Sequence, residues 1–427
     1  MINEALNRSD RPAIRKIEKL AITPAEKTTL SNGIPLYLIN QGNQEVCSIE
    51  LNFHAGKWLQ RQKLAARFAN RMLREGTKSY NSKEVSEKLD FYGAAIRAQT
   101  GADRATVMLN SVNKHLKEIL PVFAEIVREP VFPQAELEVV ATNGRERLKL
   151  NKTKHDYLAG RKIAAVLFGE NHPYGYESEE EDYNNISVRA LKEFYQTHYT
   201  AGNCFMIVSG KIADDVLAQI EKYFGDKSWS GAKPVVPQIV ATPSPQLRHR
   251  VKMERSVQSA IRIGKHLFNK THPDFQKLQV LNTVLGGYFG SRLMSNIRED
   301  KGFTYGIQSG LSSLLHDGYF FISTEVGYEV TEAALKEIYS EINRLRNELI
   351  PDEELELVRN YFSGKILSGV DGPFKLADFY AGLLIYGLDI DYAHRLLETV
   401  KTVTPKELRD LANQHLNTDG LFEVVVG

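Results

Sequence analysis

The sequence has few cysteines and no apolar stretch long enough to cross a membrane. Only Cys47 and Cys204 occur among 427 residues, and they lie far apart in the chain. We therefore expect two buried, reduced thiols rather than a disulfide framework, which is typical of a cytoplasmic protein. No apolar run approaches about eighteen residues, and the first residues lack the basic start and apolar core of a secretory signal. The sequence therefore predicts no membrane attachment.

An excess of charge of one sign is also missing. Lysine and arginine number 54 and aspartate and glutamate 53, which gives a formal net charge of +1. Such a balance offers no basic footprint for a phosphate backbone, so we expect no nucleic-acid partner. A chain of 427 residues is long for one core and suits two domains.

The eleven histidines contain no pair suited to a helical metal site. No two of them are three or four residues apart, so no helix can present two imidazoles on one face. The sequence therefore predicts no catalytic metal, and no other cofactor, in this chain.

Two segments of the chain, residues 186–210 and 403–427, resemble each other without gaps. Each begins with a residue suited to cap a helix, Ser187 or Thr404. Each then runs through an amphipathic helical pattern into a short apolar strand. The chain is therefore predicted to contain two similar halves. Matched pairs include Leu191 with Leu408, His198 with His415 and Phe205 with Phe422.

A proline-rich segment separates the two halves. Four prolines lie within residues 229–245, where they block both helix and central strand. We therefore expect an N-terminal domain over residues 1–228, a linker over 229–245 and a C-terminal domain over 246–427. Strand patterns near the start of each half and helical patterns later predict an α+β fold.

Residues 286–290 (GGYFG) could suggest a phosphate-binding loop, but they lack its lysine and follow a helical pattern. We expect them to end that helix and form a turn. Residues 172–175 (HPYG) predict a structural loop.

Three segments together resemble one family of proteins. Residues 67–77 (RFANRMLREGT) resemble the HFLEHMLFKGT segment of the M16 metallopeptidases, the pitrilysin, insulinase and mitochondrial processing peptidase group. Residues 286–305 resemble the family's SRL…LREKxGLxY signature, and residues 172–175 resemble its HPYG loop. The resemblance implies two similar α+β domains, each a mixed β-sheet with helices packed on it, which enclose a cavity.

The chemical groups of the family's zinc site are replaced. In the family two histidines ligate zinc and a glutamate activates water, whereas here Arg67 and Arg71 take the histidine places and Asn70 the glutamate place. Guanidinium has no lone pair for a metal, and an amide is no general base. The resemblance places the third ligand near residues 145–147, where Glu146 is the candidate. We hypothesise that the charge of the two arginines replaces that of the metal and is paired by carboxylates such as Glu146; a solvated basic face is the alternative.

The second half keeps two residues that the resemblance implies are functional. Arg298 and Tyr305 stand at the family's spacing for a pair that holds the substrate backbone and the developing oxyanion. Both are donors suited to a carbonyl oxygen that gains charge. The alternative is a surface salt bridge for Arg298 and core packing for Tyr305.

Some bacterial members of this family divide these parts between two chains. By resemblance we expect a non-catalytic subunit that is inactive alone and forms a heterodimer with a zinc-bearing sister subunit. It would supply Arg298 and Tyr305 for the cleavage of peptides or unfolded polypeptides, and zinc is expected only in the partner. One alternative is a structural subunit like the core proteins of respiratory complexes; another is a peptide-binding module without a role in proteolysis.

Overall fold

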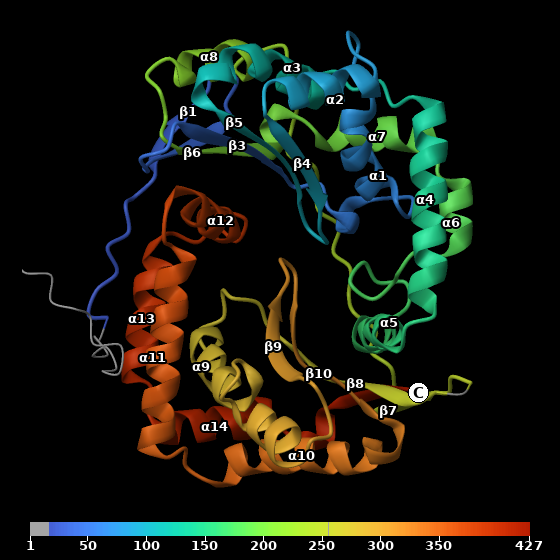
Figure 1. The fold of residues 1–427 in the computed structure, drawn as a ribbon, viewed down its shortest axis with the longest axis vertical. Helices are drawn as coiled ribbons and strands as arrows, with labels where there is room; N and C mark the ends of the chain where they lie inside the picture. The colour runs from blue at the N-terminus through green and yellow to red at the C-terminus, as the bar shows by residue number, and fades with distance from the viewer. Residues whose placement is uncertain (1–16, 255) are drawn as a thin grey trace, which may run out of the picture.

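The computed structural model describes residues 17–254 and 256–427, which are arranged around two β-sheets (Figure 1). Across the first sheet the order is β1 (Glu26–Thr29), β2 (Pro35–Asn40), β6 (Cys204–Gly210), β3 (Val46–Phe53), β5 (Ala105–Val112) and β4 (Ala95–Thr100). Across the second sheet it is β7 (Arg248–Val251), β11 (Phe422–Val426), β8 (Gln258–Leu267), β10 (Gly318–Gly327) and β9 (Ile307–Ser313).

The two sheets are mixed and share one topology. In the first, β2 and β6 are parallel; in the second, β7 and β11 are parallel; the remaining pairs are antiparallel. Apart from the extra edge strand β1, the second sheet repeats the strand order of the first. The predicted α+β class with two similar sheets is confirmed.

Helices surround both sheets. The first half contains α1 (Ala65–Arg71), α2 (Ser82–Phe91), α3 (Leu116–Arg128), α4 (Gln134–Lys152), α5 (His155–Phe168), α6 (Glu180–Asn185), α7 (Val188–His198) and α8 (Val216–Phe224). The second contains α9 (Phe275–Gly286), the π-helix η5 (Met294–Asp300), α10 (Thr331–Asn347), α11 (Asp352–Gly369), α12 (Pro373–Leu384), α13 (Asp391–Thr402) and α14 (Pro405–His415). None of these described helices is long and apolar enough to cross a membrane.

The repeated segments fold alike, as predicted. Ser187 Oγ accepts a hydrogen bond from the Ala190 amide at 3.3 Å and caps α7, while Thr404 Oγ1 accepts one from the Glu407 amide at 3.2 Å and caps α14. These hydroxyls satisfy amides that have no partner within a helix. Each helix leads into an interior strand of its sheet, β6 or β11.

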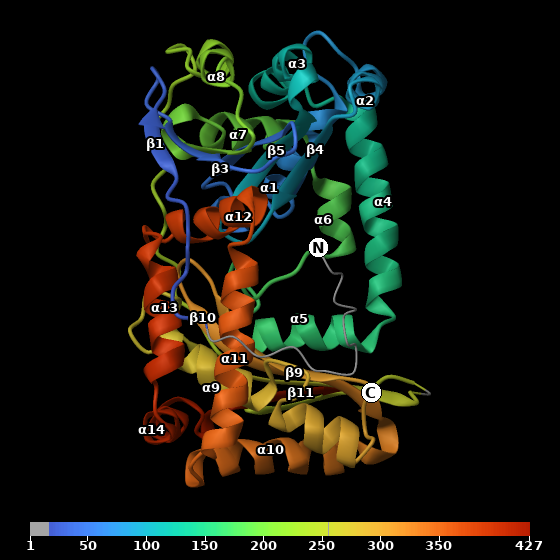
Figure 2. The same ribbon diagram turned by 60° about the vertical axis from the view of Figure 1, so that its left-hand side comes forward.

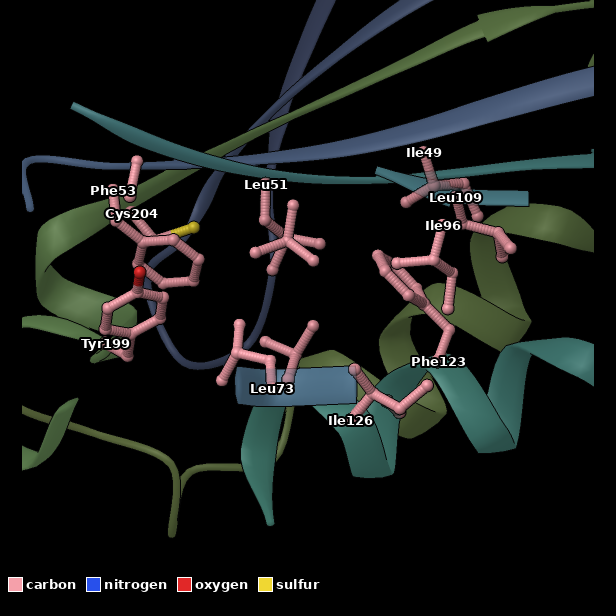
Figure 3. Close-up of a cluster of buried hydrophobic side chains, with 14 of the residues drawn as sticks. Ile49, Leu51, Phe53, Leu73, Ile96, Leu109, Phe123, Ile126, Tyr199 and Cys204 are labelled. Carbon is pink, nitrogen blue, oxygen red and sulfur yellow. The ribbon is translucent and has the colours of Figure 1, made fainter. Parts of the chain in front are cut away.

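The core of the first half lies between its sheet and the helices on one face (Figure 3). Alternate residues of β3, namely Ile49, Leu51 and Phe53, are at most 1% exposed and belong to one cluster with Phe123 and Ile126 of α3. Side chains alternate between the faces of a strand, so this spacing commits one face of β3 to the core.

The opposite face of each sheet is partly covered by a helix from the other half. Leu376 and Ala381 of α12 pack against Ile39 and Ile207 of the first sheet. Conversely, α5 packs on the second sheet, with its Leu167 fully buried. Figures 1 and 2 show α12 beneath the first sheet and α5 above the second.

The HPYG loop also joins the halves. The Tyr174 hydroxyl donates to Asp103 Oδ1 at 2.5 Å and accepts from the His316 amide at 3.2 Å. The same aspartate accepts from the Leu315 amide at 3.0 Å through Oδ2. Because Leu315 and His316 lie in the β9–β10 connection, this loop connects the two halves, which agrees with the structural role expected for it.

Other sequence expectations are met locally. Helix α9 ends at Gly286, with Gly287 as its C-cap, so the glycine segment does close a helix. Cys47 and Cys204 are buried and free. Residues 225–247, between α8 and β7, contain no helix or strand. The division of the chain into two domains joined by a linker at residues 229–245 stays a prediction. Each sheet is partly covered by a helix of the other half, α12 or α5.

The contact between α12 and the first sheet predicts a large cost for truncation. Leu376 is 1% exposed, so Leu376→Ala should lower the free energy of unfolding by about 2–5 kcal/mol, since it removes buried methyl groups and leaves a cavity. Leu367→Ala, on the 44% exposed Leu367 of α11, is the matched control and should change it by less than about 0.5 kcal/mol. Urea denaturation measures both, and equal effects would contradict this account.

A buried histidine predicts sensitivity to acid. His198 is 7% exposed, and burial, with a smaller contribution from the charge of Arg61, lowers its pKa from 6.5 to about 4. The unfolded chain then binds the proton first, so stability should fall as the pH falls from about 6.5 to about 4. This histidine alone can account for at most about 3 kcal/mol. His198→Leu should lessen the loss, measured by urea unfolding at pH 7.5 and 4.5; an unchanged difference would refute the assignment.

Candidate functional site

The positions of the replaced zinc motif lie in a pocket of the first half. Its volume is about 420 Å³, and its walls come from α1, α4, α6 and the edge strand β4. Figures 1 and 2 show α1, α4 and α6 together on one side of the first sheet. The lining residues are Arg67, Phe68, Arg71, Ala98, Thr100, Val140, Asn143, Gly144, Arg147 and Tyr183. We call this the arginine pocket.

Arg67 and Arg71 lie one helical turn apart on α1 and are both exposed. Arg71 Nη1 lies 2.5 Å from Glu75 Oε1, and Ser82 Oγ donates to Oε2 of the same carboxylate at 2.9 Å. Tyr183 of α6 lines the same pocket, where burial raises the pKa of its hydroxyl and the positive charge of Arg67 opposes that rise. Both arginines therefore line the pocket, and only Arg71 is paired with a carboxylate.

Asn70 lies beneath these arginines and is 1% exposed. Its Nδ2 donates to the carbonyl oxygens of Gln99 at 2.6 Å and Thr106 at 3.3 Å, which belong to β4 and β5. An amide that donates to two backbone carbonyls ties α1 to the sheet. Asn70 therefore has a structural connection at the place where the family has its general base.

The expected pairing by a carboxylate holds for Arg71, which pairs with Glu75, but neither arginine pairs with Glu146. The Glu146 carboxylate lies 3.0 Å from Lys149 Nζ and 3.8 Å from Arg145 Nε. The pocket is instead lined from α4 by Asn143 and Arg147, four residues apart. Residues at that spacing share a face of a helix, whereas residue 146 is turned away from it by about 100°. Arg147 could have been found by counting helical turns along α4 from a residue known to face α1.

These residues do not fit a zinc ion. Three guanidinium groups have no lone pair to donate and repel a dication. Within residues 17–254 and 256–427, no group of three or more histidine, cysteine, aspartate or glutamate side chains is arranged to hold a metal. The arginine pocket therefore offers no route to metal-assisted hydrolysis.

Arg298 lies on the π-helix η5, and Tyr305 lies near the end of the connection from η5 to β9. The guanidinium carbon of Arg298 is 4.6 Å from the centre of the Phe289 ring, a cation–π contact. Tyr305 is 96% exposed, so the alternative that it packs in the core is wrong. Neither residue lines the arginine pocket, whose described lining comes entirely from the first half. The structure does not bring the two predicted sets of residues into one site.

Comparison with protein families shows which family this chain belongs to. Residues 36–173 match the insulinase domain of peptidase family M16, and residues 185–362 match the peptidase M16 inactive domain. The chain belongs to the M16 family.

Its relatives include proteins described both as peptidases and as non-peptidases. This M16 chain is 24% identical over 355 residues to "Uncharacterized zinc protease YmxG" of Bacillus subtilis, covering 81% of this chain and 84% of the relative. It is 24% identical over 375 residues to "Non-peptidase homolog YmxG" of Helicobacter pylori, covering 85% and 84%. It is 22% identical over 453 residues to "Cytochrome b-c1 complex subunit 1, mitochondrial" of Caenorhabditis elegans, covering 100% and 94%.

A solved structure supports the same fold. The peptidase M16 inactive domain from Pseudomonas fluorescens superimposes with a TM-score of 0.85 at 23% identity, covering 94% of this chain and 98% of that one. With the replaced ligands, these matches identify an inactive member of the M16 family.

The geometry predicts which substitutions would restore metal binding. Arg67→His, Asn70→Glu and Arg71→His together supply two imidazoles and a base but leave the α4 wall without a ligand. Adding Arg147→Glu should tighten zinc binding by at least about tenfold, because it supplies the third ligand from the wall that faces α1. Competition with a chromophoric chelator measures the affinity. If the triple variant, which keeps the native Glu146, binds zinc as tightly as the variant that also carries Arg147→Glu, our placement of the third ligand at position 147 is wrong.

Proposed function

We propose that this chain is the non-catalytic subunit of a heterodimeric M16-type zinc peptidase. In this proposal a sister chain carries the His-x-x-Glu-His motif and the zinc, and this chain supplies Arg298 and Tyr305 to the sister's site. The substrate would be a peptide or an unfolded polypeptide, and the complex would be cytoplasmic, which the two buried thiols favour.

The observation that supports this proposal most directly is a contrast between the two halves. The first half has arginines at the ligand positions, whereas the second presents the Tyr305 ring to solvent. A tyrosine that is 96% exposed contributes little to packing within this chain, so its side chain is free to contact another molecule. Phe289, beneath the Arg298 guanidinium, is itself 62% exposed. The pair is therefore available to a molecule outside this chain.

The chemistry of the two side chains suits a hydrolytic site. A guanidinium that stays protonated and a phenol hydroxyl can both donate to a peptide carbonyl oxygen as it gains negative charge. Neither group ligates a metal or accepts the proton of water in this role. Arg298 would hold the substrate backbone and Tyr305 would stabilise the oxyanion, while the sister chain performs the chemical step.

A structural subunit is the second candidate. It is favoured by the similarity over the whole chain to a protein named as a cytochrome b-c1 complex subunit. In that case the chain would assemble with partners without contributing a group to any reaction.

One experiment separates these two functions. The tagged chain is captured from its native cells, its partners are identified by mass spectrometry, and a partner with a His-x-x-Glu-His motif is co-expressed with it for a peptide-cleavage assay. Tyr305→Phe should lower kcat by about a hundredfold, because it removes one oxyanion donor. Arg298→Ala should lower kcat/KM as well, and both variants should still co-purify with the partner.

The matched control is Tyr328→Phe, on a tyrosine that is 59% exposed on another part of the second half. It loses the same hydroxyl and should leave cleavage unchanged. If the complex assembles and cleaves peptides equally well with Arg298→Ala and Tyr305→Phe, the chain has a structural role. Zinc-dependent cleavage by the purified chain alone would also overturn the proposal.

A further inference from the structure

The arginine pocket has a composition that the proposed function does not use. Arg67 and Arg71 line it from α1 and Arg147 lines it from α4, so three arginines border one pocket of about 420 Å³. Among the described residues, none of those that line the pocket is acidic. Like charges held this close repel one another, and an anion between them would relieve the repulsion.

The three arginines are not equally neutralised. Glu75 pairs with Arg71, at 2.5 Å. Arg67 and Arg147 form no ion pair with any carboxylate in residues 17–254 and 256–427. The nearest candidate by sequence, Glu146, is engaged by lysine and arginine neighbours on its own helix. Two positive charges in the pocket therefore remain uncompensated.

The walls of the pocket are fixed by packing. Helices α4 and α6 approach so closely that a Cβ on Gly144 would lie 2.5 Å from Cε1 of Tyr183. The Tyr183 ring also meets the Phe68 ring edge-on, with centroids 6.0 Å apart. Arg67 lines the pocket beside Tyr183, and Arg147 lines it from the facing helix α4. The helices that carry the arginines are therefore packed in place before any ligand arrives, which lowers the cost of binding.

Apolar surfaces complete the site. Phe68, Ala98 and Val140 add apolar surface beside the arginines. This combination suits a carboxylate attached to a carbon chain, because guanidinium forks match its two oxygens and the apolar wall receives the carbon atoms.

The position of the pocket indicates that the carboxylate belongs to a peptide. Ala98 and Thr100 are residues of β4, the edge strand of the first sheet. An extended peptide that runs beside this edge would pass the pocket mouth. A peptide C-terminus and an acidic side chain both offer the required group.

We propose that the arginine pocket binds the carboxylate of a peptide, so that guanidinium groups receive an anion where active relatives hold a metal. This inference does not depend on a sister chain or on Arg298 and Tyr305. It is therefore tested on the purified chain alone, and its failure would leave the proposed function untouched.

The test is a calorimetric titration with three short acetylated alanine peptides. One ends in a free carboxylate, one is its amide, and one is an amide with an internal glutamate. At least one carboxylate peptide should bind about tenfold or more tightly than the neutral amide, since charge-assisted hydrogen bonds are much stronger than neutral ones. Comparing the two carboxylate peptides shows whether the terminus or the side chain is preferred. Equal binding of all three would overturn the proposal.

Substitutions locate the binding. Arg67→Gln and Arg147→Gln should each weaken carboxylate binding by about tenfold and leave the amide unaffected, and Arg147→Lys, which keeps the charge without the fork, should bind with intermediate affinity. Arg395→Gln, on an exposed arginine of α13 that pairs with Asp389, removes the same charge elsewhere and is the matched control. Urea unfolding confirms that each variant is folded. Carboxylate binding that survives both glutamine substitutions would show that the pocket is not the site.

Discussion

Each sheet of this protein depends on the other half of the chain to bury part of its second face. The helices of one half cover one side of its own sheet, and α12 or α5 crosses over to cover part of the other half's sheet. An apolar sheet face must be packed against another element to remain out of water. This exchange therefore holds the two halves together, and the Tyr174–Asp103 contacts with the β9–β10 connection add a polar junction.

This arrangement explains how the metal site was replaced while the scaffold stayed intact. The residues of α1 that support the fold, such as Ala66 and Ala69, are buried in the core of the first half. Arg67 and Arg71 occupy the exposed positions of the same helix, where a change of chemistry leaves the core unaltered. Asn70 is buried, and its amide gains two bonds to backbone carbonyls of β4 and β5. In this chain α1 is therefore a packing element with a cationic outer face.

Much of the fold and part of the site could be predicted from the sequence. The caps Ser187 and Thr404 and the helix end at Gly286 rest on local chemistry, so they appear where expected. The expected ion pair of Glu146 with the arginines was wrong because a shift of one residue rotates a helix by about 100°, and the sequence alone does not set that phase. The exposure of Tyr305 was also undecided, since it depends on what packs against the connection between η5 and β9.

The sequence by itself determined that this chain has two similar α+β halves and no helical histidine pair, because patterns of apolar residues and residue identity are local properties. Only the tertiary structure decided which α4 residue meets Arg67 and Arg71, that Tyr305 faces solvent, and that the halves exchange helices. Those outcomes join residues that are distant in the chain, and they follow from how helices and sheets bury apolar surface in three dimensions.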